Sequence, residues 1–187
     1  MVFSSYYNSE NKCLIITSDS QVESTKEEGN DLYFYNEEGN VVGANLCLEY
    51  DKAGLVDLKA INDPRLERFI NDEVPFKYGL IKIIEDHPNS DHLHICQVND
   101  GVDKQIVCGA KNVEAGKVAI VAQIGAVMPS GLAIKPSTLL KVDSCGMMCS
   151  LFELGLADKS EGIFLSDNLD LQGQVFGEEQ NEWIDAN

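Results

Sequence analysis

One short stretch of the sequence holds side chains that could act in acid–base catalysis. Asp86, His87 and Asp91 lie there close together. The chain has no nucleophile elbow with a serine triad, no glycine-rich phosphate loop and no HExxH motif. A turn around Pro88 explains the group without catalysis. We therefore expect no enzyme activity.

The cysteines are the other residues that could do chemistry, by binding metal or forming disulfides. None forms a CxxC motif, and Cys145 and Cys149 with the three histidines match no zinc ribbon or finger spacing. In apolar runs a thiol packs as a small hydrophobe. We expect no metal, no cofactor and reduced thiols, because the start of the chain has no secretory signal pattern. The six cysteines are Cys13, Cys47, Cys96, Cys108, Cys145 and Cys149.

Length and charge predict two domains and an acidic tail. The chain has 187 residues, 31 acidic and 14 basic, with a formal net charge of −17, and its 44% hydrophobic content can build a core. No apolar run reaches the roughly 20 residues of a membrane span, so we expect a soluble cytoplasmic protein. Residues 1–75 hold 15 acidic and 6 basic residues, whereas residues 76–177 hold 12 and 8. The expected domains are 1–74 and 75–177, followed by the tail 178–187.

The local patterns predict a mainly β protein. The first domain is expected to be a small α+β unit, with strands at 13–17, 32–35 and 41–48. Its helix is predicted to begin at Asp63, with Pro64 at the first position. The second domain is expected to be a small closed barrel of short strands at 78–84, 93–98, 105–108, 117–121, 134–142 and 162–165. A hairpin turn is predicted at 99–101, a helical turn at 112–116 and a short helix near 150–154.

Six short motifs in the second domain carry a family resemblance. They read HPNSDHL at 87–93, CQV at 96–98, QIVCGAKNV at 105–113, GAVMPSG at 125–131, SCGMMCS at 144–150 and ELG at 153–155. In this order they resemble the tRNA-binding domain family. That family has an OB fold and includes modules of phenylalanyl- and methionyl-tRNA synthetases, stand-alone dimers and the EMAP-II-like domain. The first domain, with YYN at 6–8 and FYNEEG at 34–39, is similar to the leader domain of bacterial stand-alone members.

The resemblance implies a non-catalytic protein that binds folded tRNA through a C-terminal OB-fold barrel. All eight bases in residues 76–177 are lysines, which bind phosphate as point charges but lack the fork that reads a guanine edge. Aromatic residues are few there, so recognition of RNA shape is favoured over base stacking. The expected RNA-binding residues are Lys111, Asn112, Lys135, Lys141, Ser144, Met147 and Ser150.

Several of these residues have a structural alternative that the sequence leaves open. Asn112 could be a helix N-cap, and Met147 could be a core methionine in a turn flanked by serines. Lys135 and Lys141 could line one groove or be ordinary solvated strand lysines.

The chain departs from the family at residues 139–142. Many relatives have Leu-Arg-Gly-Val there, whereas this chain has Leu-Leu-Lys-Val. Because side chains alternate between the faces of a strand, we expect the charge of Lys141 to point to the opposite side.

The expected partners follow from the resemblance and from the charge. They are tRNA, a second copy of the chain, and an aminoacyl-tRNA synthetase or other basic protein, with no membrane. The alternative function is a protein-interaction or chaperone-type adaptor, because a net charge of −17 repels polyanions and suits basic protein partners.

Overall fold

The computed structural model describes residues 1–177, which form two compact units. The first unit comprises Met1–Pro75 and Gly125–Ala133, and the second comprises Phe76–Ile124 and the described residues from Ile134 onward. None of the helices in the described part has the length and apolar character to cross a bilayer. The tail expected at 178–187 lies outside the described residues, and the expected division at 74/75 stays a prediction.

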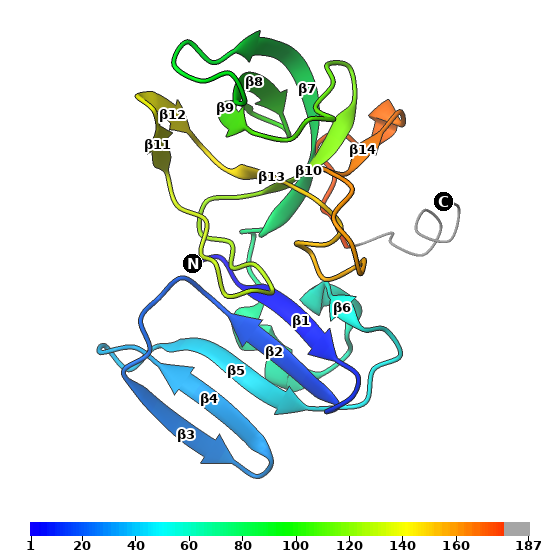
Figure 1. The fold of residues 1–187 in the computed structure, drawn as a ribbon. Helices are drawn as coiled ribbons and strands as arrows, with labels where there is room; N and C mark the ends of the chain where they lie inside the picture. Colours follow the sequence, from blue (N-terminus) through cyan, green and yellow to red (C-terminus); the bar gives the residue numbers. More distant parts are fainter. Residues whose placement is uncertain (178–187) are drawn as a thin grey trace. The chain divides into compact units, whose positions relative to one another are not determined.

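A six-stranded antiparallel sheet makes up the first unit (Figure 1). The sheet order is β3-β4-β5-β2-β1-β6. The bounds are β1 (Ser4–Asn8), β2 (Cys13–Thr17), β3 (Ser24–Glu28), β4 (Asp31–Tyr35), β5 (Val41–Cys47) and β6 (Gly54–Leu55), followed by the 3₁₀ helices η1 (Leu58–Ala60) and η2 (Pro64–Phe69).

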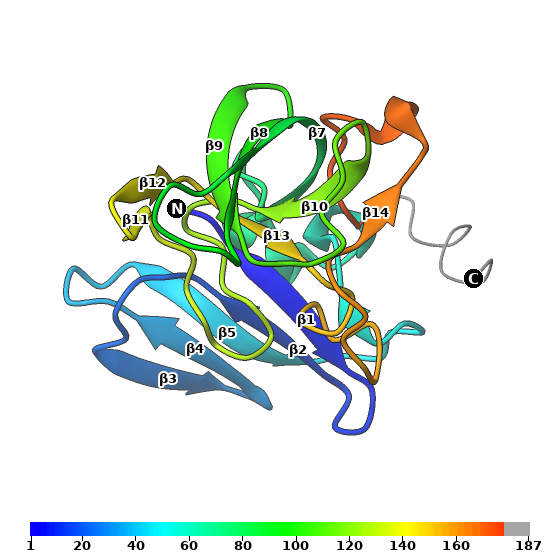
Figure 2. The same cartoon turned by 45° about the horizontal axis from the view of Figure 1, so that its top comes forward.

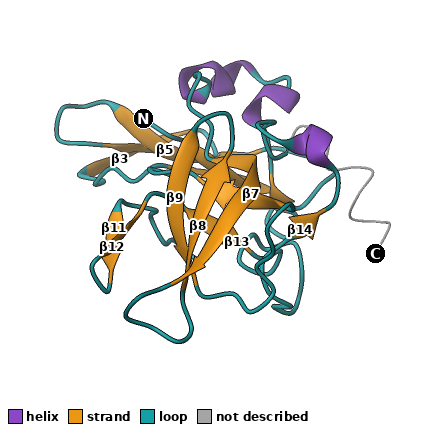
Figure 3. Ribbon diagram, turned by 90° about the horizontal axis from the view of Figure 1, so that it is seen from above, coloured by secondary structure: helices purple, strands orange, loops and turns teal. Residues whose placement is uncertain are grey.

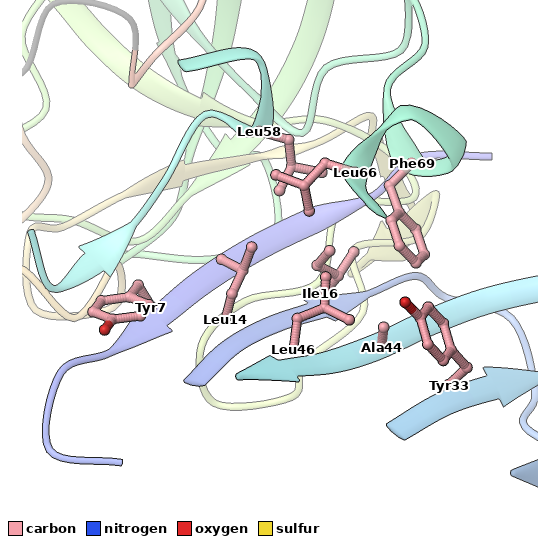
Figure 4. Packing of buried hydrophobic residues seen from close by; sticks show 9 residues of the cluster. All are labelled: Tyr7, Leu14, Ile16, Tyr33, Ala44, Leu46, Leu58, Leu66 and Phe69. Carbon is pink, nitrogen blue, oxygen red and sulfur yellow. The ribbon is translucent and has the colours of Figure 1, made fainter. Parts of the chain in front are cut away.

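Alternating apolar side chains of this sheet form the core of the first unit. Leu14 and Ile16 are fully buried on β2, while the other residues of this strand, which alternate with them, are half-buried. Leu66 and Phe69 of η2 complete the cluster, and Figure 4 shows their side chains beside those of the strands. Each fully buried aliphatic or aromatic side chain contributes roughly 1.5–3 kcal/mol. The sheet and the two short helices therefore share one core.

The α+β expectation for the first unit is wrong in its helical part. The predicted helix does begin after Asp63, whose carboxylate accepts from the Arg65 N–H at 2.9 Å, and Pro64 is its first residue. It is, however, a six-residue 3₁₀ helix. α-Helices shorter than about 12 residues are marginal without strong packing, and 3₁₀ bonding serves short connecting pieces. The unit is an antiparallel β structure with short 3₁₀ turns (Figure 3).

Arg65 joins η2 to the sheet through two aspartates. Its guanidinium lies 2.8 Å from Asp31 on β4 and 2.5 Å from Asp63, and it donates to the Cys47 carbonyl at 3.3 Å. The Asp31 side chain is only 10% exposed. Because a buried carboxylate without a partner is strongly destabilising, the position of η2 depends on this contact.

The segment Gly125–Ala133 belongs to the first unit although it lies in the second half of the sequence. Its Val127 N–H donates to the Ser4 hydroxyl at 2.9 Å, and Val127 pairs with Ala133 in an antiparallel bridge. Ala126, Val127 and Met128 are buried. The sequence contains no local pattern that predicts this packing.

The second unit is built on an antiparallel sheet with the order β13-β10-β7-β8-β9. Its edges approach each other where the Cys145 N–H donates to the Gln105 carbonyl at 2.8 Å, and the strands curve around a common core (Figure 2). This confirms a mainly β unit and is consistent with an OB fold; complete closure stays a prediction. The bounds are β7 (Phe76–Asp86), β8 (His94–Asn99), β9 (Asp103–Cys108), β10 (Val118–Ala122), β11 (Ser137–Leu139), β12 (Val142–Ser144), β13 (Met147–Cys149), β14 (Leu165–Ser166) and η3 (Leu169–Leu171).

The prediction of one strand over 134–142 is wrong, because β11 and β12 form a hairpin between Ser137 and Ser144. Leu139 pairs with Val142, and Leu140 and Lys141 are the two turn residues, with φ of 45° and 75°. Positive φ at both positions is the geometry of a tight hairpin turn that glycine and asparagine prefer. Lys141 therefore lies at the tip of a turn, and the expectation that strand alternation turns its charge away is also wrong.

Replacing Arg65 by methionine tests the link between η2 and the sheet. We expect Arg65→Met to lower the free energy of unfolding by about 3 kcal/mol, because Asp31 loses its cation in a nearly buried site. Arg68→Met is the matched control. Arg68 lies 4.9 Å above the Tyr33 ring, a contact worth at most about 1 kcal/mol. Urea unfolding of both variants measures the difference; equal losses contradict the assignment.

The same network predicts a dependence of stability on pH. Hydrogen bonding to Arg65 holds the pKa of Asp63 below its usual value. A carboxylate with a lowered pKa stabilises the folded state above its unfolded pKa, and this stabilisation is lost as the pH falls through the folded pKa. We expect the free energy of unfolding, measured from pH 6 to pH 2, to decrease once the pH is lower than about 4. The decrease should be less steep in Arg65→Met.

Substituting the hairpin turn tests its strain. We expect Leu140→Asn combined with Lys141→Gly to raise the free energy of unfolding by about 1 kcal/mol, because asparagine and glycine tolerate positive φ better than leucine and lysine do. Lys135→Gly is the control, since Lys135 is not among the residues with positive φ and glycine there adds only unfolded-state entropy. Thermal unfolding compares the variants, and a destabilised double variant counts against a strained turn.

Candidate nucleic-acid interface

One end of the second unit's sheet brings together loops that are distant in the sequence. Asp86 at the end of β7 pairs with His94 at the start of β8, and His94 pairs with Cys108 at the end of β9. The loops that follow β7 and β9 therefore leave the sheet at the same end. We call this the loop end of the sheet.

His87 fastens the β11–β12 hairpin to the loop end. It is buried, its Nδ1 accepts from the Asn89 N–H at 3.1 Å, and its Nε2 lies 3.1 Å from the Leu139 carbonyl. A carbonyl only accepts, so Nε2 is the donor in this contact. The Asn89 amide also donates to the Leu140 carbonyl at 3.1 Å. His87 therefore has a structural role, as the sequence favoured.

Two of the three expected lysines lie at the loop end. Lys141 is exposed at the hairpin turn, next to the residues that His87 and Asn89 hold. Lys111 is exposed in the loop that follows β9. Lys135 comes before β11, so it lies at the opposite end of the hairpin from Lys141.

Asn112 fastens a second pair of loops. Its side-chain amide donates to the Ile163 carbonyl at 2.8 Å and accepts from the Ile163 N–H at 3.0 Å. A side chain on Gly162 would meet this amide at 2.3 Å. Asn112 thus replaces a strand partner for Ile163, a role different from the helix N-cap considered from the sequence.

The two expected serines are buried and bonded within the protein. The Ser144 hydroxyl accepts from the Val107 N–H at 3.0 Å. The Ser150 hydroxyl donates to Glu153 at 2.6 Å and accepts from the Glu153 N–H at 3.1 Å, while Glu153 also accepts from the Ser150 N–H. This reciprocal pattern is a capping box. It stabilises the turn after β13.

Met147 lines a hollow of about 530 Å³ on this unit. Gly109 and Ala110 of the loop after β9 form another part of the lining. Phe152, which the sequence analysis did not select, also lines the hollow and is 51% exposed. An exposed aromatic beside a cavity is a surface on which a base could stack. The only feature of the sequence near Phe152 that points to this site is the ELG motif, which begins at its neighbour Glu153.

A second hollow, of about 680 Å³, adjoins the first at Gly162 and Ile163. Asn112 and Lys159 line it together with the acidic residues Asp158 and Glu161. The cation in this hollow is therefore accompanied by two carboxylates, so its field on a phosphate is weakened.

The lysines of the second unit differ in whether a carboxylate lies beside their ammonium group. Lys82 pairs with Asp103, Lys117 with Asp167, and Lys104 with Asp100, which is 1% exposed. Within residues 1–177, no carboxylate lies within 4 Å of the exposed Lys111, Lys135, Lys141 and Lys159. Lys111, Lys135 and Lys141 are therefore free to contact phosphate, whereas Asp158 and Glu161 line the same hollow as Lys159.

Metal binding and thiol reactivity depend on how the His, Cys, Asp and Glu side chains are grouped and buried. No group of three or more His, Cys, Asp or Glu residues within 1–177 is placed to hold a metal ion. Burial raises the pKa of Cys96 and of Cys149 to about 12. Both are neutral thiols near pH 7, in keeping with packing roles.

Comparison with known proteins relates the second unit to a protein family. The family model described as "Putative tRNA binding domain" matches residues 76–172, just over half of the chain. The β subunit of phenylalanine–tRNA ligase from Sulfurimonas denitrificans is 44% identical over 127 residues, and the one from Bdellovibrio bacteriovorus is 57% identical over 103 residues. "Putative tRNA-binding protein YtpR" from Bacillus subtilis is 52% identical over 84 residues.

The matches cover only part of each protein. They span 60%, 52% and 44% of this chain, and 16%, 13% and 42% of the respective relatives. The ligase subunits are thus matched over a small fraction of their length. The matched family region spans β7 to η3, including the loop end and both hollows. The chain therefore belongs to the tRNA-binding domain family.

Proposed function

We propose that this protein binds folded tRNA without catalysis, at the loop end of the second unit, through the OB fold expected from the sequence. The observation that carries the proposal is the family match over residues 76–172. Exposed Lys111 and Lys141, at the same end of the sheet and without acidic partners among the described residues, support it. Their ammonium groups would contact phosphates.

The proposed recognition is of RNA shape. Lysines give affinity without reading base edges. Phe152 and Met147 beside the 530 Å³ hollow add room for one unstacked base, which is typical of proteins that grip loops of folded RNA.

In this proposal the expected site residues have two kinds of role. Lys111 and Lys141 contact the RNA, and Met147 lines the hollow. Asn112, Ser144 and Ser150 position the loops, because their polar atoms bond groups of the protein. Lys135 is an outlying contact, reached only by RNA that extends along the hairpin.

Few phosphate contacts make the binding weak and sensitive to salt. Two lysines release about two counterions, so affinity should fall about tenfold between 50 and 200 mM salt. The negative charge of the whole chain acts in the same direction.

Titration of fluorescent tRNA at several salt concentrations tests this proposal. We expect saturable binding at 50 mM salt. Lys111→Gln and Lys141→Gln should each weaken it about fivefold and each lower the salt slope by about one. Lys82→Gln is the control, because Lys82 is already paired with Asp103. Absence of saturable binding at 50 mM salt, or equal effects of all three substitutions, contradicts the proposal.

Restoring the arginine of relatives at the hairpin turn gives a gain-of-function test. We expect Leu140→Arg to tighten tRNA binding about fivefold at 50 mM salt and to raise the salt slope by about one, because it adds a cation beside Lys141. Leu140→Gln, which is polar but uncharged, is the control. If both variants bind equally, the turn does not contact phosphate.

A second candidate function is an adaptor for a basic protein, such as a synthetase. The charge of the first unit favours it, since residues 1–75 hold 15 acidic and 6 basic residues. A complex with a purified basic partner that survives ribonuclease treatment, in a protein that fails to bind tRNA, supports the adaptor. As part of the main proposal, the protein forms a homodimer and is located in the cytoplasm, where tRNA acts.

A further inference from the structure

Two cysteines of the first unit face each other across neighbouring strands. Cys13 on β2 and Cys47 on β5 are direct partners in the antiparallel register. Directly opposed residues project from the same face of a sheet. The two side chains therefore lie next to each other, although the sequence separates them widely.

The hydrogen bonds around this pair define its geometry. The Leu48 N–H donates to the Lys12 carbonyl at 3.2 Å, whereas the Cys47 N–H donates to Asp31 at 2.9 Å. Bonds between the residues that flank a pair, and not within it, identify a non-hydrogen-bonded pair. The Cα atoms of such a pair are about 4.5 Å apart and its side chains are especially close. This separation lies within the roughly 4.4–6.8 Å that disulfides span.

The backbone of Cys47 is held while its side chain is accessible. Asp31 accepts from its N–H, and Arg65 donates to its carbonyl at 3.3 Å. The residue is exposed, and its thiol donates to the Asn30 carbonyl at 3.3 Å. A rotation of this side chain away from Asn30 moves the sulfur without moving the strand.

The two thiols differ in access to solvent. Cys13 is half-buried, and burial, with smaller effects of Cys47 and Asp31, raises the pKa of its thiol. A bulky oxidant therefore reaches Cys47 first, and Cys13 is placed to react with the product.

We propose that Cys13 and Cys47 are a reversible oxidation site that closes to a cross-strand disulfide by exchange with a small-molecule disulfide such as glutathione disulfide. The Cys47 thiolate attacks one sulfur of glutathione disulfide, whose S–S bond breaks and releases one glutathione. Cys13 then loses its proton to solvent and attacks the Cys47 sulfur, displacing the second glutathione. Two protein thiols are oxidised, and one glutathione disulfide is reduced to two glutathione molecules.

Closing this bond would join β2 to β5 at the centre of the six-stranded sheet. A disulfide stabilises mainly by restricting the unfolded chain between its cysteines. We therefore expect the oxidised protein to unfold at a temperature higher by about 5 °C or more.

The test uses the full chain carrying Cys145→Ser, since Cys145 is exposed and would add its own adduct. Reduced protein is incubated with glutathione disulfide, acid-quenched and analysed by intact mass and peptide mapping. We expect a product lighter by two hydrogens, with the peptides of Cys13 and Cys47 linked. In Cys13→Ser the reaction should stop with one glutathione on residue 47, and Cys47→Ser should form neither product.

Persistent glutathione on Cys47 of the parent protein, at the level found in Cys13→Ser, overturns the proposal. So does a linkage of Cys47 to any cysteine other than Cys13. The melting temperatures of the oxidised and reduced parent protein give a second measurement that requires no substitution in the pair. An unchanged melting temperature in a protein proven to be linked contradicts the proposed restriction of the unfolded chain.

Discussion

Backbone N–H and C=O groups that no neighbouring strand bonds need other partners when they are buried, and polar side chains supply several of them in this protein. Asn112 bonds both backbone groups of Ile163, Ser144 accepts from the Val107 N–H, and His87 bonds the Leu139 carbonyl. In each contact a side chain takes the place of a backbone partner on a neighbouring strand. The positions of the loops, of the two hollows beside them and of the lysines on them all depend on these contacts.

The first unit uses the same device with charged groups. Arg65 and Asp31 bind the carbonyl and the N–H of Cys47, where β5 leaves the ladder. Because Asp31 is nearly buried, the pair must stay together. The ion pair of Arg65 and Asp31 positions η2 and also holds Cys47 opposite Cys13. It therefore contributes both to the packing of the unit and to the geometry of its thiols.

Much of the strand pattern could be predicted, because apolar alternation is a local signal. Strand β2 was predicted with its observed bounds, and β4, β5 and β7–β10 were predicted to within a few residues. The local patterns do not predict β1, β3, β6 or β13. All five residues of β3 are exposed, so no burial pattern marks it, and β6 has only two residues. The turn residues Leu140 and Lys141 are not the asparagine or glycine that signals a tight turn, so the sequence predicts one strand where the β11–β12 hairpin lies.

The mainly β class and the family can be predicted from the amino-acid sequence, because each motif is a run of neighbouring residues whose types and order can be read directly. The role of each motif residue, in contrast, follows from contacts with residues far away in the chain. Asn112 and His87 find their partners 51 and 52 residues away, and Lys135 and Lys141 lie at opposite ends of a hairpin whose turn has no local signature. Whether a polar side chain bonds the backbone or faces a ligand depends on which distant groups need a partner, and only the packed chain brings those groups together.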